Sequence, residues 1–327
     1  MDGNKSTTLT VLGCGNLGLA ILSGILDSIS KSAHQSGGSN GNNDLFQTPT
    51  RFIACVQRPQ SAERIQKAVA EIPSATENVE VFQKENLRGV QQADVVILGC
   101  KPYMVANVLG EEGMQEALAG KLLISICAGV PVDQISQALY GTSYAEAMFK
   151  GSSQPQKPCT ICRVMPNTAA LVRQSMTVIA TSNPPLPQRY QALTEWMFNQ
   201  VGRTVQLPPH LMDVSTALCG SGPAFVALMI EALSDGAVAM GLPRAEAQLM
   251  ASQTLTGTAG LVLNGEHPAL VREKVCTPGG CTMGGLIELE EGGVRGIIGR
   301  AVRRATVVAS QLGKGVSGVN GMIVGSG

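Results

Sequence analysis

The chain has little of what marks a nucleic-acid-binding protein or a metalloenzyme. Lysine plus arginine and aspartate plus glutamate each number 24, so the formal net charge is zero. A neutral chain gives no electrostatic case for binding nucleic acid or an anionic membrane surface. It has three histidines, and it contains neither an H-E-x-x-H motif nor an EF-hand loop. We therefore predict no metal site and no nucleic-acid partner.

Long apolar runs are missing as well. The apolar, uncharged run 214–230 is interrupted by Gly220, Gly222 and Pro223, and it is shorter than the ~20 residues that a membrane span needs. We interpret it as a buried helix and expect no membrane association. The first residues lack the composition of a signal or transit peptide. Nine cysteines in 327 residues are typical of reduced thiols, so we expect a cytoplasmic protein.

Aromatic residues are scarce, at 3% of the chain, whereas glycines number 38. This composition suits closely packed helices and α/β layers, and the length favours two domains. In the first part, apolar runs without periodic polar residues alternate with helical patterns, which predicts a parallel sheet covered on both faces. The predicted strands are 8–12, 52–56, 79–82, 95–99, 122–127 and 161–165, with edge strands at 176–180 and 204–207 around a helix at 188–199.

Two segments of this part need separate interpretations. The stretch 36–43 is rich in glycine, serine and asparagine and is expected to be a flexible surface insertion. Cys159 and Cys162 form a C-x-x-C pair that suggests zinc or redox chemistry. Residues three apart in a strand point to opposite faces, so we favour ordinary strand cysteines.

After Pro208-Pro209 the strand signals stop. Helical patterns are expected at 212–240 with a break at 220–223, from Pro243 to about 263, at 282–290 and at 294–312. This places a domain boundary after residue 207, between an α/β domain (1–207) and an all-helical domain (208–327). Helices this apolar on a neutral protein suggest burial against another subunit.

The first strand ends in a dinucleotide fingerprint. Gly13-x-Gly15-x-x-Gly18 lies between a predicted strand and a predicted helix. In such motifs the first glycine makes the turn, the second lets the backbone approach a pyrophosphate, and the third packs the helix on the strand. The position of the motif on the first strand of an alternating α/β pattern makes it a predicted nucleotide site.

The residue after the second strand selects between cofactors. An NAD site places an acidic residue there, whereas this chain has Gln57-Arg58-Pro59. The Arg58 guanidinium suits a 2′-phosphate, so we predict NADPH, with NADH possible. The alternative is a solvated arginine at a strand end. Lys101-Pro102 ends the fourth strand and either touches the cofactor or is solvated.

A second anion site is predicted near the other end of the chain, in the segment 275–282. Pro278-Gly279-Gly280 permits a tight turn followed by a helix start, flanked by the hydroxyls of Thr277 and Thr282. The free amides of a helix start suit a carboxylate. Helix capping is the simpler alternative for both threonines.

Six motifs, in order, resemble pyrroline-5-carboxylate reductase: 13–18, 100–102, 125–130, 163–168, 220–225 and 277–282, the last being the most specific. The resemblance spans about 9–312. It implies a Rossmann-like domain followed by a helical dimerisation domain, a homodimer or larger homo-oligomer formed through the C-terminal helices, and reduction of the cyclic imino acid 1-pyrroline-5-carboxylate to proline with NAD(P)H.

The resemblance also implies roles for individual residues. Thr282 is the proposed hydrogen-bond donor to the substrate nitrogen, and Cys281 is a departure, since many relatives carry threonine or alanine there. The implied substrate-binding residues are Glu266, Thr277, Gly280, Cys281 and Thr282. The implied cofactor-binding residues are Gly13, Gly15, Asn16, Leu17, Gly18, Arg58, Asn86, Lys101, Pro102 and Ala128.

Two other functions stay open at this point. A related 3-hydroxyacid dehydrogenase would depend on a catalytic lysine in the helical domain, for which Lys274 is the candidate, although it looks like a solvated lysine at a helix end. A non-catalytic NADP-sensing protein would bind NADPH without turning over any cyclic imine.

Overall fold

A computed structural model describes residues 6–35, 45–72, 78–151 and 157–313. The expected insertion at 36–43 lies outside these residues. The chain divides into two compact units, Met1–Gly220 with Thr306–Gly327, and Ser221–Ala305.

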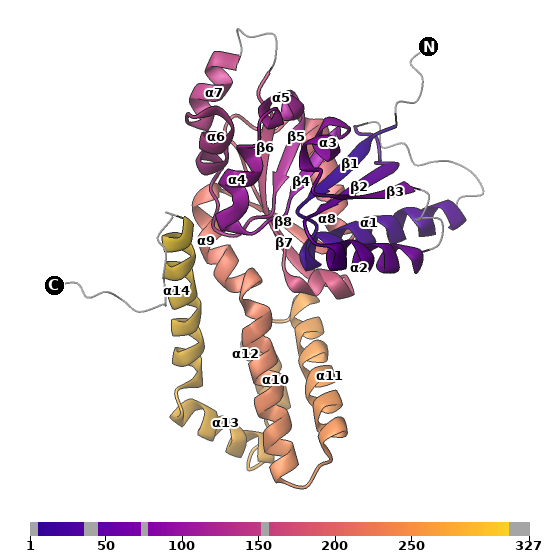
Figure 1. Cartoon of the computed structure of the whole chain (residues 1–327). Helices are drawn as coiled ribbons and strands as arrows, with labels where there is room; N and C mark the ends of the chain where they lie inside the picture. The colour runs from indigo at the N-terminus through magenta and orange to yellow at the C-terminus, as the bar shows by residue number, and fades with distance from the viewer. Residues whose placement is uncertain (1–5, 36–44, 73–77, 152–156, 314–327) are drawn as a thin grey trace, which may run out of the picture. The chain divides into compact units, whose positions relative to one another are not determined.

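The first unit is built on one eight-stranded sheet with the order β3-β2-β1-β4-β5-β6-β7-β8 (Figure 1). The order 3-2-1-4-5-6 of the first six strands is that of a doubly wound dinucleotide-binding sheet. All eight predicted strands are present, with their ends shifted by a few residues. They are β1 (Thr8–Leu12), β2 (Arg51–Val56), β3 (Val79–Gln83), β4 (Val95–Leu98), β5 (Leu122–Ser125), β6 (Thr160–Met165), β7 (Ser175–Ala180) and β8 (Gly202–Leu207).

One pair of strands departs from the predicted parallel sheet. β6 and β7 pair antiparallel, whereas the other neighbours pair parallel. A parallel partner requires a crossover of a dozen or more residues. Only a short turn of 3₁₀ helix, Thr168–Val172, links β6 to β7, so the chain reverses. The 188–199 helix then makes the crossover from β7 to β8, as predicted.

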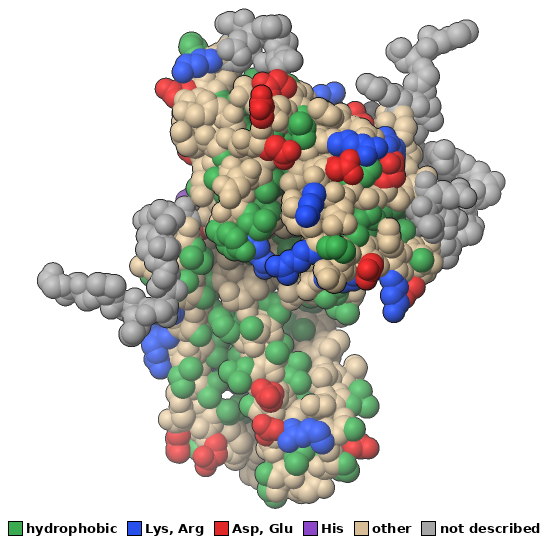
Figure 2. All heavy atoms as spheres, viewed as in Figure 1, with side chains coloured by type: hydrophobic (Ala, Val, Ile, Leu, Met, Phe, Trp, Pro, Cys, Tyr) green, Lys and Arg blue, Asp and Glu red, His purple; other side chains and the backbone are tan. Residues whose placement is uncertain are grey.

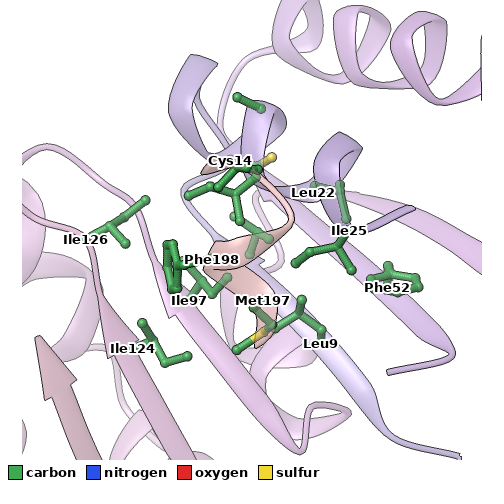
Figure 3. Packing of buried hydrophobic residues seen from close by; sticks show 14 of the residues in the cluster. Leu9, Cys14, Leu22, Ile25, Phe52, Ile97, Ile124, Ile126, Met197 and Phe198 are labelled. Carbon is green, nitrogen blue, oxygen red and sulfur yellow. The ribbon is translucent and has the colours of Figure 1, made fainter. Parts of the chain in front are cut away.

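Helices cover both faces of the sheet because its strands are apolar on both sides. Along β4, Val95 and Ile97 belong to one buried cluster, and Val96 and Leu98 belong to the other. The first cluster includes residues of α1 (Asn16–Gln35), α2 (Pro59–Ala70) and α8 (Gln188–Asn199), and part of it is seen in Figure 3. The second includes residues of α3 (Asn86–Gln91), α4 (Val105–Leu109), α5 (Met114–Leu118) and α6 (Val132–Tyr140), and Tyr144 of α7 (Tyr144–Gly151) packs against it.

The C-x-x-C pair follows the same alternation. Cys159 lies in the second buried cluster and Cys162 in the first, so the two thiols point to opposite faces of the sheet. Both are free and buried. The interpretation as ordinary strand cysteines is confirmed.

The first unit continues past the expected domain boundary at 207. It includes a 3₁₀ turn (Pro209–Leu211), α9 (Met212–Ser215) and a turn of π-helix (Thr216–Gly220). Met212 is fully buried against Val178 and Ala180 of β7. The Asn167 side-chain amide donates to the Cys219 carbonyl at 3.0 Å. These contacts hold the segment to the sheet.

The second unit consists of helices joined by short turns, with no strand among its described residues. It contains α10 (Gly222–Ala239), α11 (Arg244–Leu263), α12 (Pro268–Val275), α13 (Cys281–Glu291) and the first part of α14 (Val294–Gly313). Many apolar side chains on these helices are exposed, among them Leu228 at 65%, Met240 at 87% and Leu249 at 69%, and hydrophobic side chains are visible at the surface (Figure 2). Within one chain, this unit leaves apolar helix faces uncovered.

One helical run is notable for its hydropathy. The run Pro209–Ala239 is long and apolar enough to cross a membrane, judged by length and composition alone. Unlike the buried helix expected from the sequence, it has only 6% of its most apolar window buried. The apolar side chains of this run therefore need a partner surface that covers them.

Candidate active site

The glycine turn after β1 is held from two neighbouring strands. The amides of Gly13 and Cys14 donate to the Cys55 carbonyl of β2 at 3.2 and 2.9 Å. Gly13 has φ of +79°, and a Cβ atom there would lie 2.8 Å from the Cys100 nitrogen, just after β4. Only glycine fits this conformation and this approach without strain.

The other two glycines of the motif have different surroundings. A Cβ atom on Gly18 would lie 3.0 Å from Cγ1 of Val11, so this glycine allows α1 to pack on β1. A Cβ atom on Gly15 would meet nothing within 4 Å. The backbone at Gly15 is therefore open on the side where a side chain would stand.

The first turn of α1 presents unused donors. The first amide that closes a helical turn is that of Leu19, which donates to the Gly15 carbonyl at 2.9 Å. The amides of Asn16, Leu17 and Gly18 precede it and point out of the helix end. Three amides at a helix N-terminus beside an open glycine fit a pyrophosphate.

Two arginines flank this end of the sheet. Arg58 directly precedes α2 and is exposed, with extended backbone. Arg64, inside α2, donates from Nη1 to Oδ1 of Asn16. Sequence reasoning missed Arg64, because an arginine on an exposed helix face carries no signal of what it contacts.

The ends of β4 and β5 lie beside the glycine turn. Lys101 and Pro102 follow β4 and are exposed, and Ala128 follows β5 and is exposed as well. The Ile126 amide donates to the Leu98 carbonyl at 3.0 Å, and the Cys127 thiol donates to the Cys100 carbonyl at 3.3 Å. The structure thus brings these predicted residues to the carboxyl edge where the glycine turn lies.

Three thiols near this edge, those of Cys14, Cys55 and Cys127, have raised pKa values. Burial is the largest cause for Cys14 and Cys55 and raises the pKa of each to about 12. The pKa of Cys127 is raised by its hydrogen bond with Cys100 and by burial. In the described part of the chain, no cluster of three or more His, Cys, Asp or Glu side chains suits a metal ion.

Asn86 is the first residue of α3, half-buried after edge strand β3. The Lys84 amide donates to the Val56 carbonyl at 2.9 Å, which ties the turn after β3 to the end of β2. Asn86 therefore lies on the Arg58 side of the glycine turn.

In the helical unit, the predicted second anion site is a tight turn that starts a helix. Gly279 has φ of +69°, and Gly280 is the N-cap of α13 without a side-chain cap. The Met283 amide closes the first turn on the Gly280 carbonyl at 3.1 Å, so the amides of Cys281 and Thr282 precede it. This arrangement suits a carboxylate.

The two threonines flank the N-cap of α13. The N-cap residue is Gly280, so neither Thr277 nor Thr282 occupies the capping position. Thr282 is half-buried and Thr277 is exposed in the single chain.

Glu266 lies in an ion pair. Its Oε2 is 2.6 Å from Nζ of Lys274, in the last turn of α12. Lys274 is 67% exposed in that last turn, so the expectation of a solvated lysine at a helix end is confirmed, and the ion pair is an addition to it. Sequence reasoning had named both residues without pairing them.

Two family models match the chain. The model described as pyrroline-5-carboxylate reductase dimerisation covers residues 209–312, which include the whole apolar run Pro209–Ala239. The model described as NADP oxidoreductase, coenzyme F420-dependent, covers residues 8–129, which include β1 to β5.

Known proteins match over nearly the whole chain. A curated pyrroline-5-carboxylate reductase of Lophium arboricola is 59% identical over 317 residues, with 96% of each chain covered. The structure of a pyrroline-5-carboxylate reductase from Coxiella burnetii has a TM-score of 0.72 at 25% identity, covering 94% of this chain and 99% of that one. A Plasmodium falciparum pyrroline carboxylate reductase with NADP bound shares the fold, with a TM-score of 0.69 at 24% identity over 94% of this chain and 98% of that one.

Proposed function

The chain belongs to the pyrroline-5-carboxylate reductase family, and from this premise we propose how its residues carry out the reaction. It reduces 1-pyrroline-5-carboxylate to L-proline with NAD(P)H, the last step of proline biosynthesis. The observation that carries the proposal is the glycine turn after β1, where Gly13, Gly15 and three unused amides of α1 form a site suited to a pyrophosphate.

We propose that the first unit holds the nucleotide. Gly13, Gly15 and the amides of Asn16, Leu17 and Gly18 would bind its pyrophosphate. Arg58 would bind the 2′-phosphate of NADPH, and Asn86 would lie on the adenosine side. Lys101, Pro102 and Ala128 would line the path toward the nicotinamide. When bound, NAD(P)H supplies the hydride.

The turn before α13 would hold the substrate. The amides of Cys281 and Thr282 would donate hydrogen bonds to the carboxylate, because the helix start offers free N–H groups and partial positive charge. Since a backbone amide suffices, a cysteine at 281 fulfils the role. Thr277 and Gly280 would shape the turn. Glu266 would be held beside it by its ion pair with Lys274, in the last turn of α12.

The chemical step needs little from the protein beyond orientation. The protonated imine accepts hydride at carbon, and the electron pair of the C=N bond becomes the lone pair of the amine nitrogen. The Thr282 hydroxyl would hydrogen-bond this nitrogen as its charge and geometry change. Fixing the carboxylate selects the ring face that receives the hydride.

The experiment that tests this function is an absorbance assay of NADPH consumption with 1-pyrroline-5-carboxylate, beside a parallel assay of 3-hydroxyacid oxidation. We expect turnover with the imine and formation of proline. Turnover with the hydroxyacid alone would establish the dehydrogenase instead. NADPH binding without any turnover would establish the sensing protein.

We propose that the exposed apolar faces of the helical unit are covered by a second copy of the chain. The dimerisation family model covers this region. It supports a second protein copy, rather than lipid, as the surface that covers the apolar run Pro209–Ala239. Light scattering in detergent-free buffer tests this, with a homodimer or a larger homo-oligomer expected. Monomers that partition into vesicles would refute it.

We propose the cytoplasm as the compartment. The support is that all nine cysteines are free, including the exposed Cys281, as suits a reducing environment. Microscopy of the full chain carrying a C-terminal fluorescent tag tests the assignment against the mitochondrion.

A further inference from the structure

Arg64 reaches the helix end at which the glycine turn opens. Its Nη1 donates to Oδ1 of Asn16, the first residue of α1. Its positive charge also opposes the effect of burial on the pKa of Cys14, which lies inside the turn. Two observations therefore place the guanidinium beside the donors of α1.

This position is unfavourable for a cation in the absence of a ligand. A helix N-terminus carries partial positive charge and attracts anions. Within the described residues, Arg64 makes no ion pair that would neutralise it. Two positive groups held together without a carboxylate point to an anion that joins them.

Packing does not explain the arrangement either. Ile65 and Val69 are the residues that bury α2 in the core, whereas Arg64 is exposed. An exposed polar contact contributes little to stability. A guanidinium has five N–H donors in a rigid fork, so donating to Asn16 leaves donors for a ligand.

We propose that Arg64 binds the pyrophosphate of NAD(P)H together with the α1 amides, and that Asn16 positions the guanidinium. This inference rests on the proposed nucleotide site. The proposal gives Arg58 and Arg64 different ligand groups. Arg58, at the end of β2, would read the 2′-phosphate that only NADPH carries. Arg64, on α2 beside the N-terminus of α1, would bind the pyrophosphate, which NADPH and NADH share.

The test is calorimetric binding of NADPH and of NADH to the full-length Arg64→Met variant, without substrate. We expect Kd to rise about tenfold for both cofactors, as for a lost charge-assisted hydrogen bond. Lys67→Met, which removes a cation exposed on the same helix, is the matched control and should leave both values unchanged. The melting temperature of each variant without ligand confirms folding.

The other outcomes overturn the proposal. Unchanged Kd values for both cofactors would remove Arg64 from the site. A loss confined to NADPH would assign it to the 2′-phosphate. A loss as large in Lys67→Met would indicate general charge rather than a specific contact. Failure of the proposed nucleotide site would look different, because the wild-type chain would then bind neither cofactor. Failure of the imine reduction would appear only in the turnover assay and would leave the wild-type Kd values measurable.

Asn16 has its own test. If Asn16 positions Arg64, then Asn16→Ala raises Kd in the wild-type background and has no further effect in the Arg64→Met background. Independent, additive losses would show that Asn16 does not act through Arg64.

Discussion

Gly13 and Cys100 approach so closely that a Cβ atom on Gly13 would lie 2.8 Å from the Cys100 nitrogen. The first residue belongs to the turn after β1, and the second follows β4, the adjacent strand. Gly99 takes part in the same contact, because its amide donates to the Leu12 carbonyl at 2.8 Å. The nucleotide turn is therefore built against the neighbouring strand end, which couples its shape to the core.

Gly13→Ala should destabilise the fold, whereas Gly15→Ala should not. Alanine at 13 would have to adopt φ of +79° and clash with backbone, so we expect a loss of roughly 1–3 kcal/mol in the free energy of unfolding. At Gly15 the added methyl group meets only open space, where the cofactor would lie. Urea unfolding and NADPH titration of both variants check this. Equal stability losses would contradict it.

Thr282→Ala should lower kcat with little change in cofactor Kd, because the hydroxyl acts on the substrate nitrogen. A loss of about a hundredfold is the order for a lost acid–base partner. Thr282→Ser, which keeps the hydroxyl, is the control and should retain most of the activity. Steady-state kinetics and cofactor titration measure both. Full turnover in the alanine variant would remove Thr282 from the mechanism.

Arg58→Ala should raise the KM for NADPH more than the KM for NADH. The side chain is exposed and follows β2, where the 2′-phosphate is expected. Loss of a charge-assisted contact would raise the NADPH value about tenfold. Arg88→Ala, on α3, is a control for charge, since Arg88 is paired with Glu85. Equal changes for both cofactors would indicate that Arg58 is only a solvated arginine.

Lys274→Ala should leave kcat within a few-fold of the wild type. The lysine is paired with Glu266 at 2.6 Å and its side chain is 67% exposed, and such a pair stabilises a fold by no more than about 1 kcal/mol. A hydroxyacid dehydrogenase would instead lose its catalytic lysine. The measurement is kcat for the imine with NADPH. A collapse in kcat with intact folding would revive that rival mechanism.

Stability should decline at alkaline pH because of buried thiols. Burial raises the pKa of Cys14 and of Cys162 from 9.0 to about 12. The native state then holds these protons more tightly than the unfolded state. The stability is fully present below pH 9 and is lost as the pH rises toward 12. Urea unfolding across this range checks the trend. Cys162→Ala should flatten it, and the exposed Cys281→Ser should not.

Much of the first unit was predictable because its signals are local. Short runs rich in apolar residues predicted all eight strands, and Gly13-x-Gly15-x-x-Gly18 predicted the turn. The helices α4 to α7 escaped prediction, because short helices show little periodicity. The antiparallel β6–β7 pair also escaped, since it depends on the length of a link rather than on the strands.

The candidate site divides in the same way. The glycines and Thr282 were found from motif and resemblance, because their chemistry is tied to residue type and spacing. Arg64 was not found, because its contact with Asn16 joins two helices whose packing no local pattern encodes. The pairing of Lys274 with Glu266 was missed for a similar reason, although both residues had been named.

By itself, the sequence determined the strands, the glycine turns, the long helices and the family, because hydrophobic alternation, glycine conformation and motif spacing are properties of short segments. Only the tertiary structure decided where the helical segment 209–220 packs, which face each cysteine occupies, and which charges meet. Those outcomes depend on contacts between residues distant in sequence, such as Met212 packed against Val178. The free energy of burying two such side chains together arises only when both segments are in place, so neither segment alone can reveal it.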